Sequence, residues 1–428
     1  MSERWTHALL DELSRQGDEV AGKIVLERLA RCPFDDQPGA GILGADQLRE
    51  QMFAYMGEMK HRGGRTALAQ KWYESPAEPP DWMCTELLVE GQRFFAVHGL
   101  EMSVALFFAS LPTSYAVTQA ASVLHRVSDL ATDDLVRRVA ETGHMLIDVM
   151  GMAGDGSFRA GGRAHGTACG LRVLHGFVRE LVRAHGWDTS TFGEPANQEM
   201  LISTLLDFTV VTWHAIERMG VPVSLQVRRA HLHAWSVVGH LMGVAPALLP
   251  LELEDASALS RLLQERHFPA DDSAIATAQG QQLAAALLEQ MRLFMPLGWG
   301  RMPATLMHWL FEGAEGRAAF VPKSLGVPPP SRVLRLVLNA QRWMNLHLLD
   351  LPGIGSVVGW MSRRFGKLVI LSFVDLYAPG PSPFSVPEEL LQSWRLHSGA
   401  RASGARAKRN AVRGRIRSRR VDRAKLKR

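Results

Sequence analysis

The segment that decides the fold lies between residues 168 and 184 and reads ACGLRVLHGFVRELVRA. At about 3.6 residues per helical turn, Arg172, His175 and Arg179 fall within roughly 60° of one another. An apolar arc runs beside them, made by Leu171, Leu174, Val178, Leu181 and Val182. The pattern predicts an amphipathic helix in which one histidine, flanked by two arginines, lies at the border between the apolar and polar faces.

The two arginines bear on the chemistry of His175. Nearby cations oppose protonation of an imidazole, so they favour the neutral form that a metal ligand needs. The same arginines also offer partners to carboxylates. A plainer interpretation stays open, in which the helix is half-buried, its arginines are solvated and its histidine is a satisfied core residue.

Composition and charge narrow the class of protein. The chain has 428 residues, of which 46% are hydrophobic and 21% are charged, a balance typical of a globular protein with a large core. The last 28 residues hold 13 Lys or Arg and one Asp, whereas the rest holds 35 Lys or Arg and 42 Asp or Glu. The body is therefore acidic, which argues against a fold built to bind nucleic acid.

The cysteines and the lengths of the apolar runs predict the cellular compartment of the protein. Cys32, Cys84 and Cys169 are far apart and form no CxxC pair, which argues against a disulfide framework and against a cysteine-based zinc site. The first twenty residues are charged and lack the apolar core of a secretory signal. Because the longest apolar runs are also too short for a membrane span, we expect a cytoplasmic protein without a transmembrane segment.

The spacing of apolar residues predicts an all-α fold with one large multi-helix domain. They recur at three- and four-residue intervals along most of the chain, and residues 367–376 are the one plausible short strand, although a buried helix fits them equally well. We expect a helical N-terminal extension over residues 1–44, with one helix across 1–30, and the large domain over 45–385. Residues 386–428 form a basic tail that we expect to be disordered. That tail either contacts nucleic acid or an anionic membrane, or only solubilises the chain.

A second helix of interest is expected after Thr132, an N-cap hydroxyl followed by two acidic residues. One stripe of this helix contains Leu135, Arg138, Thr142, Met145 and Val149. Its arginine and threonine need partners if they are buried, although a rim arginine and a hydroxyl bonded to its own helix would also satisfy the pattern. The glycine-rich residues 151–166 lack the GxGxxG and GK[ST] patterns of phosphate loops and are interpreted as a connection.

Taken in order, these blocks resemble one family. The helix with Arg138 and Thr142, the AGGR of the loop, LRVLHGFVR and PANQEMLISTLLDF are similar to the rubber oxygenase catalytic domain. This is the family of latex-clearing proteins and mpaB-type oxygenases. The start of that domain resembles DWMCTELLVEGQRFFAVHGLEMSVALFFASLP, and its middle resembles GVPVSLQVRRAHLHAWSVVGHLMGV. The resemblance covers about residues 45–380.

The resemblance implies a globin-like core around haem b and a haem-dependent oxygenase that uses O2 or peroxide on a hydrophobic, isoprenoid- or lipid-like substrate. It implies that His175 is the proximal iron ligand, and that Arg172 and Arg179 either orient it or pair with the haem propionates. It places Arg138 and Thr142 on the distal side, and we expect Glu141 to join them in shaping the catalytic part of the pocket.

Two positions depart from the family pattern. Latex-clearing proteins carry a lysine just before the threonine, where this chain has Glu141. Their acid–base glutamate corresponds in spacing to about Ser122, and His125 follows one turn later. Glu141 or His125 is then the expected base. Two alternatives stay open: a non-enzymatic helical protein that binds haem or another hydrophobic ligand, and a nucleic-acid-associated protein that acts through its tail.

Overall fold

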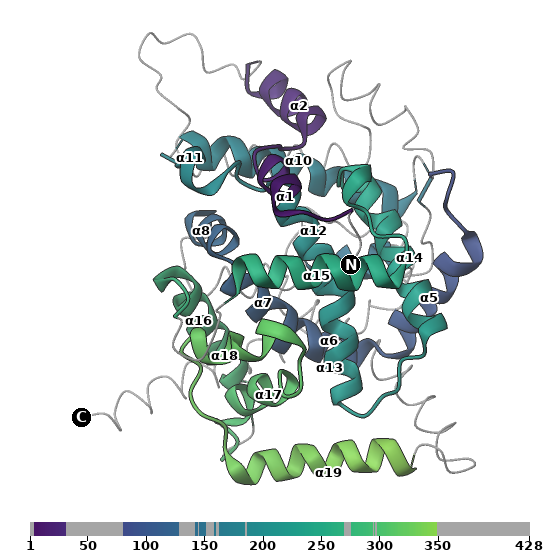
Figure 1. Cartoon of the computed structure of the whole chain (residues 1–428), viewed down its shortest axis with the longest axis vertical. Coiled ribbons are helices and arrows are strands. Elements are labelled where there is room, and N and C mark those ends of the chain that lie inside the picture. The colour runs from purple at the N-terminus through teal and green to yellow at the C-terminus, as the bar shows by residue number, and fades with distance from the viewer. Residues whose placement is uncertain are drawn as a thin grey trace, which may run out of the picture.

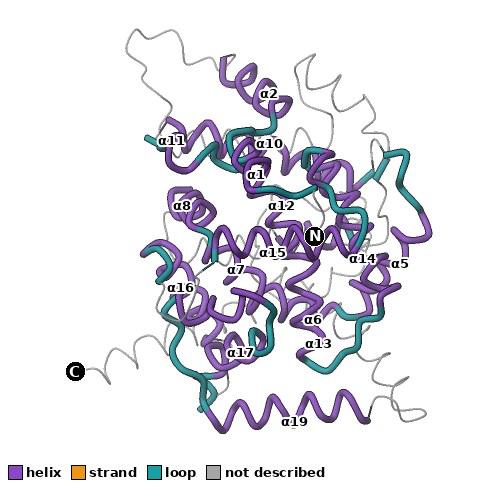
Figure 2. Tube along the Cα trace, viewed as in Figure 1, coloured by secondary structure: helices purple, strands orange, loops and turns teal. Residues whose placement is uncertain are grey.

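The computed structural model describes residues 4–30, 80–127, 142–143, 145–150, 158–159, 162–184, 186–268, 275–293, 295 and 298–348. Within these ranges the chain forms helices and loops and no strand (Figure 2), which confirms the all-α prediction. Residues 367–376, the basic tail, Arg138 and Glu141 lie outside the described residues.

The described part of the chain contains helices of three kinds, and Figure 1 labels the α-helices. Elements η1 and η2 are π-helical, η3 and η4 are 3-10 helices, and the others are α-helices. In chain order they are α1 (His7–Leu13), α2 (Glu19–Ala30), α5 (Thr85–Val97), α6 (Gly99–Ala105), η1 (Leu106–Ser110), α7 (Leu111–Ala116), α8 (Thr118–Val127), α10 (Arg163–Ala184), α11 (Thr189–Phe192), α12 (Gln198–Leu206), η2 (Asp207–Val211), α13 (Thr212–Arg218), α14 (Leu225–Leu241), η3 (Pro246–Leu248), α15 (Leu253–His267), α16 (Ala278–Leu293), α17 (Met302–Leu310), η4 (Gly316–Phe320), α18 (Val321–Ser324) and α19 (Arg332–Leu348).

The centre of the fold is the pairing of α14 with α5. Gly91 of α5 lies so close to α14 that an added Cβ would be 2.3 Å from the carbonyl oxygen of Ala230 and 2.9 Å from the Cβ of Ala234. Glycine therefore lets the two backbones approach closely. The side chain of Ser224 caps α14 by accepting the backbone N–H of Val227 at 3.3 Å, which fixes where this central helix begins.

A buried imidazole joins α14 to α13. His231 is fully buried, and Trp213 directs its indole N–H at Nδ1 over 3.0 Å while Trp235 directs its own at Nε2 over 3.1 Å. Burial lowers the pKa of His231 to about 3, so the ring is neutral at physiological pH. His231 is thus a polar residue of the core.

The prediction of one helix across residues 1–30 is wrong, because the chain breaks between α1 and α2. Gly17 lies against the guanidinium of Arg179, where an added Cβ would be 2.5 Å from Nε. Asp18 then starts a new helix, since its carboxylate accepts the backbone N–H of Ala21 at 3.2 Å. The break exists because a partner from a distant helix occupies the space beside the connection.

Among the described residues, no single helix is long and apolar enough to cross a membrane. One pair, Thr85–Val97 with Gly99–Ala116, reaches the required length and composition only jointly, with a bend of 82° between its halves.

The contact between α5 and α14 makes a specific prediction. We expect Gly91→Ala to lower the free energy of unfolding by about 2–3 kcal/mol, because the new methyl group meets backbone atoms that cannot move alone. Gly22→Ala in α2 is the matched control, since nothing lies within 4 Å of its added Cβ. That variant should gain up to about 1 kcal/mol from helix propensity. Chemical denaturation measures both, and equal shifts would contradict the close approach.

Candidate functional site

Helix α10 is the predicted helix around residues 168–184, extended toward its N-terminus to Arg163. It packs against α2 (Figure 1), and Gly176 makes this possible. A Cβ on Gly176 would lie 3.0 Å from Cγ2 of Val25 and 3.2 Å from the carbonyl oxygen of Ala21. The helix thereby holds its histidine and its arginines next to the N-terminal segment.

His175 is enclosed around one ring nitrogen. Its side chain keeps partial exposure, but Nδ1 is buried and has no hydrogen-bond partner in the described part of the chain. Burial lowers the pKa of His175 to about 4, the Arg179 cation lowers it further and Asp18 opposes the shift. At neutral pH the imidazole is therefore uncharged, mainly because of burial rather than because of its neighbouring cations. A neutral ring with an unpartnered nitrogen has the chemistry of a metal ligand.

Arg172 forms a two-pronged ion pair with Asp18. Its Nε lies 2.5 Å from one carboxylate oxygen, and Nη2 lies 3.1 Å from the other. Both side chains are largely buried, so the pair joins α10 to the connection between α1 and α2 in a region that excludes most water. Sequence reasoning identified the arginine but not its partner, which lies 154 residues away.

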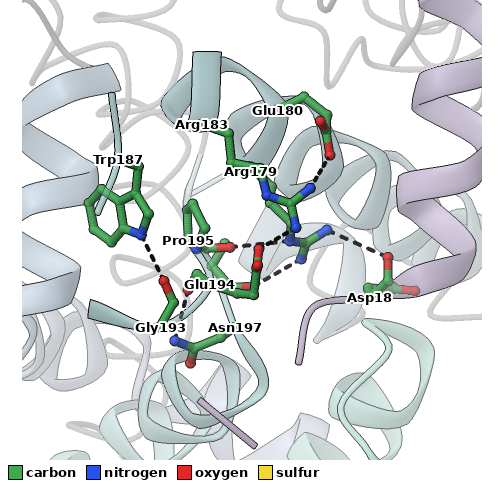
Figure 3. A network of polar contacts seen from close by, with 10 residues as sticks. Asp18, Arg179, Glu180, Arg183, Trp187, Gly193, Glu194, Pro195 and Asn197 are labelled. Atoms are coloured by element: carbon green, nitrogen blue, oxygen red, sulfur yellow. Dashed lines mark hydrogen bonds and ion pairs between the residues drawn. The ribbon is translucent and has the colours of Figure 1, made fainter. Parts of the chain in front are cut away.

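Arg179 is buried more deeply, with an exposed fraction of 2%. Figure 3 shows its guanidinium directed at main-chain oxygens: Nε donates to Pro195 at 3.2 Å, Nη2 to Ala196 at 3.0 Å and Nη1 to Asp18 at 3.5 Å. Ala196 has a φ of 49°, in the left-handed region that is uncommon for residues other than glycine. Arg179 thus donates hydrogen bonds to three carbonyl groups, which belong to the connection between α1 and α2 and to the loop before α12.

A second polar cluster ties α10 to the segment before it. Asp148 is buried and accepts hydrogen bonds from Nη2 of Arg163 at 2.7 Å and from Oγ1 of Thr167 at 2.6 Å. Residues 145–149 are helical, as the sequence predicts. Asp148 therefore fixes the second predicted helix against the N-terminal end of α10.

The predicted distal residues are only partly described. Thr142 lies in a helical stretch with its side chain exposed, whereas Arg138 and Glu141 lie outside the described residues. Ser122 is buried on α8, and Nε2 of His125 lies 2.9 Å from Oε1 of Gln282 on α16. The structure therefore pairs His125 with a neutral amide, and the distal roles stay predictions.

Sequence reasoning missed a buried carboxyl group at the meeting of the two π-helical segments. Asp207 begins η2, which packs against η1. Its Oδ2 accepts the hydroxyl of Ser114 at 2.7 Å, and its carbonyl oxygen accepts the hydroxyl of Ser110 at 2.7 Å. Burial raises the pKa of Asp207 to about 8, against which the Ser114 hydrogen bond acts weakly. An acidic residue inside the apolar run LLDFTVV is the signal that was available.

On α10, His175 is the predicted metal ligand, whereas His165 is buried beside Cys169, with Nε2 3.6 Å from Sγ. No group of three or more His, Cys, Asp or Glu side chains suited to a metal ion occurs in the ranges that the structure covers. A haem iron needs a single protein nitrogen on its proximal side, so a lone histidine is compatible with it. An open pocket of about 460 Å³ lies elsewhere, between α13 and α19, and none of its lining residues belongs to α10.

Comparisons with known proteins agree with this architecture. The family model described as ER-bound oxygenase mpaB/B'/Rubber oxygenase, catalytic domain, matches residues 95–347. A rubber oxygenase of Streptomyces sp. (strain K30) is 24% identical over 230 residues, 53% of this chain and 54% of that protein. The chain thus spans about half the length of this curated relative. A solved structure of latex clearing protein LCP in the closed state has a TM-score of 0.61 and 20% identity, covering 84% of this chain and 90% of that one, which shows a shared fold.

The ion pair on α10 predicts a large effect of one substitution. We expect Asp18→Ala to cost about 3 kcal/mol of unfolding free energy, because it leaves the Arg172 cation buried without its carboxylate. Glu19→Ala is the neighbouring control: Glu19 is exposed and its ion pair with Lys23 spans 3.7 Å, so little change is expected. Similar losses in the two variants would show that the Asp18 pair is no stronger than a surface contact.

The raised pKa of Asp207 predicts that the free energy of unfolding depends on pH. Its pKa rises from 3.8 in the unfolded chain to about 8 in the fold, so the folded state keeps a proton that the unfolded state releases. The stability this group contributes is complete below pH 4 and is lost as pH rises toward 8. Asp207→Asn keeps the shape without the titration, so its stability relative to the wild type should increase by several kcal/mol between these limits. Denaturation at several pH values measures this, and a constant difference would contradict it.

Proposed function

Because the chain belongs to the family of ER-bound mpaB oxygenases and rubber oxygenases, we propose that it is an oxygenase that uses haem b and acts on a hydrophobic substrate. The family membership supports oxygenase chemistry, and the resemblance of the LRVLHGFVR block supports the cofactor. O2 or peroxide is the proposed oxidant. The substrate class, isoprenoid- or lipid-like, comes from the same resemblance and from the name of the relative, a rubber oxygenase.

One observation carries this proposal: Nδ1 of His175 is buried without a hydrogen-bond partner in the described residues, on a ring held neutral by burial. A buried polar atom without a hydrogen-bond partner lowers the stability of a folded protein unless a bound group, such as a metal ion, interacts with it. The residues present therefore fit a haem with His175 as its proximal ligand. When bound, the haem would supply an iron centre able to activate O2 or peroxide.

The arginines beside His175 are proposed to position it. Arg172 is paired with Asp18, and Arg179 binds main-chain oxygens, so both hold α10 against the N-terminal segment. Of the two roles predicted for them, orienting the histidine agrees with these partners better than pairing with propionates. A ligand held by buried, hydrogen-bonded neighbours keeps its ring orientation and its basicity.

On the distal side, we assign Arg138, Glu141 and Thr142 to the polar part of the pocket. Glu141 is the proposed proton acceptor, since a carboxylate near the reacting atoms can take and return a proton. His125 is the second candidate, and its Nε2 is engaged with the Gln282 amide. An apolar environment around these groups would exclude water and strengthen each polar contact.

A second candidate function rests on one position. Ser122 is buried where spacing places the acid–base glutamate of latex-clearing proteins, and a serine hydroxyl cannot act as that acid. This favours a non-enzymatic protein that binds haem or another hydrophobic ligand. Consumption of O2 with a hydrophobic substrate, lost in His175→Ala, would decide for the oxygenase, whereas haem binding without turnover would decide for the binding protein.

We propose the cytoplasm as the place of action. Cys84 and Cys169 are free thiols, which supports a reducing compartment.

The haem proposal predicts a spectrum. Full-length protein expressed with sufficient haem should show a Soret band, in both the oxidised and the dithionite-reduced states, and His175→Ala should lose most of it. His308→Ala is the matched control, because this half-buried histidine of α17 also has its pKa lowered by burial and is not a predicted ligand. A folded wild type without a Soret band, or an unchanged spectrum in His175→Ala, would refute the assignment.

A further inference from the structure

The outer face of α19 is apolar and exposed. At 100° per residue, Val333, Leu336, Val337, Trp343 and Met344 fall within an arc of about 120°. Leu336 is 69% exposed and Trp343 is 58% exposed. In Figure 1 the helix lies along one edge of the molecule. A helix of a globular protein normally turns such a stripe toward its own core.

One flank and the opposite face of α19 hold the helix on the body. Asn345 donates to the carbonyl oxygen of Met219 at 2.7 Å, and Asn339 accepts the indole N–H of Trp309 at 2.8 Å. Leu338 packs against the main core. Because these contacts fix the rotation of the helix, its apolar stripe points outward as part of the fold.

The charges on α19 itself have one sign, and one of them, Arg335, pairs with Glu312 of the body at 2.8 Å. The 17 residues of α19 include three arginines and a histidine and no carboxylate, and Arg332 and Arg335 are exposed. The 80 residues that follow the helix hold 17 Lys or Arg and five Asp or Glu, whereas the 348 residues up to its end hold 31 and 38. The excess of cations lies in residues 401–428, which hold 13 Lys or Arg and one Asp, whereas residues 349–400 hold four of each sign.

We propose that the outer face of α19 docks onto an anionic lipid surface, with the helix lying in the plane of that surface. An amphipathic helix with tryptophan and aliphatic side chains on one face and cations beside them binds the boundary between headgroups and acyl chains. The cationic residues 401–428, farther along the same chain, add attraction to anionic lipids. The inference is independent of the haem and of the reaction, since it uses only α19 and the charge of the chain.

Vesicle binding tests this inference on the full-length protein. The probes are vesicles of phosphatidylcholine alone and of phosphatidylcholine with phosphatidylglycerol, with co-sedimentation as the measurement. We expect binding to the anionic vesicles and weaker binding to the neutral ones. The double variant Leu336→Glu/Trp343→Glu should bind anionic vesicles at least about tenfold more weakly, because two apolar side chains no longer enter the interface.

A matched control separates the face of α19 from apolar surface in general. The double variant Leu225→Glu/Ile275→Glu makes the same chemical change at two exposed positions outside α19 and should bind like the wild type. Circular dichroism checks that each variant is folded. In the wild type, hydrogen exchange in residues 332–348 should slow when anionic vesicles are added, which tests the face without any substitution.

Three results would overturn the proposal. Wild-type protein that ignores anionic vesicles excludes lipid docking. Equal binding by the α19 variant and the wild type, with unchanged exchange in α19, would assign the binding to the basic tail instead. A dimer in solution that the α19 substitutions dissociate, with no vesicle binding, would make the face an interface between two copies of the chain.

Discussion

The burial of charge along α10 is the constraint on which the rest of the structure depends. A guanidinium removed from water needs hydrogen-bond acceptors from the protein, and Arg179 finds them in the carbonyl groups of Asp18, Pro195 and Ala196. These residues belong to segments far apart in the chain (Figure 3). Ala196 adopts a left-handed conformation in the same loop, at a cost of order 1 kcal/mol that the surrounding contacts must offset.

This arrangement links the histidine to the fold as a whole. Asp18 accepts Arg172 through its carboxylate and Arg179 through its carbonyl oxygen, so one residue connects both arginines that flank His175. At the other end of α10, Asp148 holds Arg163 and Thr167. The helix that carries the proposed ligand is therefore fixed near its start and along its middle by buried polar contacts rather than by apolar packing alone.

The sequence predicted the helices well and their polar partners poorly. Apolar periodicity was sufficient for the helix class, and the helix predicted over residues 168–184 forms most of α10. The same periodicity extended one helix through residues 14–18, because the reason for the break there is a guanidinium from α10. Asp18 lies 154 residues from Arg172, and nothing in the spacing of either residue encodes that distance. Local patterns report which face is apolar, whereas partners of buried charges follow from the tertiary fold.

The buried imidazole between α13 and α14 has a consequence for its proton. A neutral ring offers one lone pair and carries one N–H, yet two indole donors point at its two nitrogens. In each tautomer of His231, the unprotonated ring nitrogen accepts the N–H of one tryptophan. The protonated nitrogen then faces the N–H of the other tryptophan, and no hydrogen bond forms there. The same heavy atoms support two proton arrangements with equal numbers of hydrogen bonds. Because the ring is fully enclosed, exchange between the two tautomers through water requires the core to open.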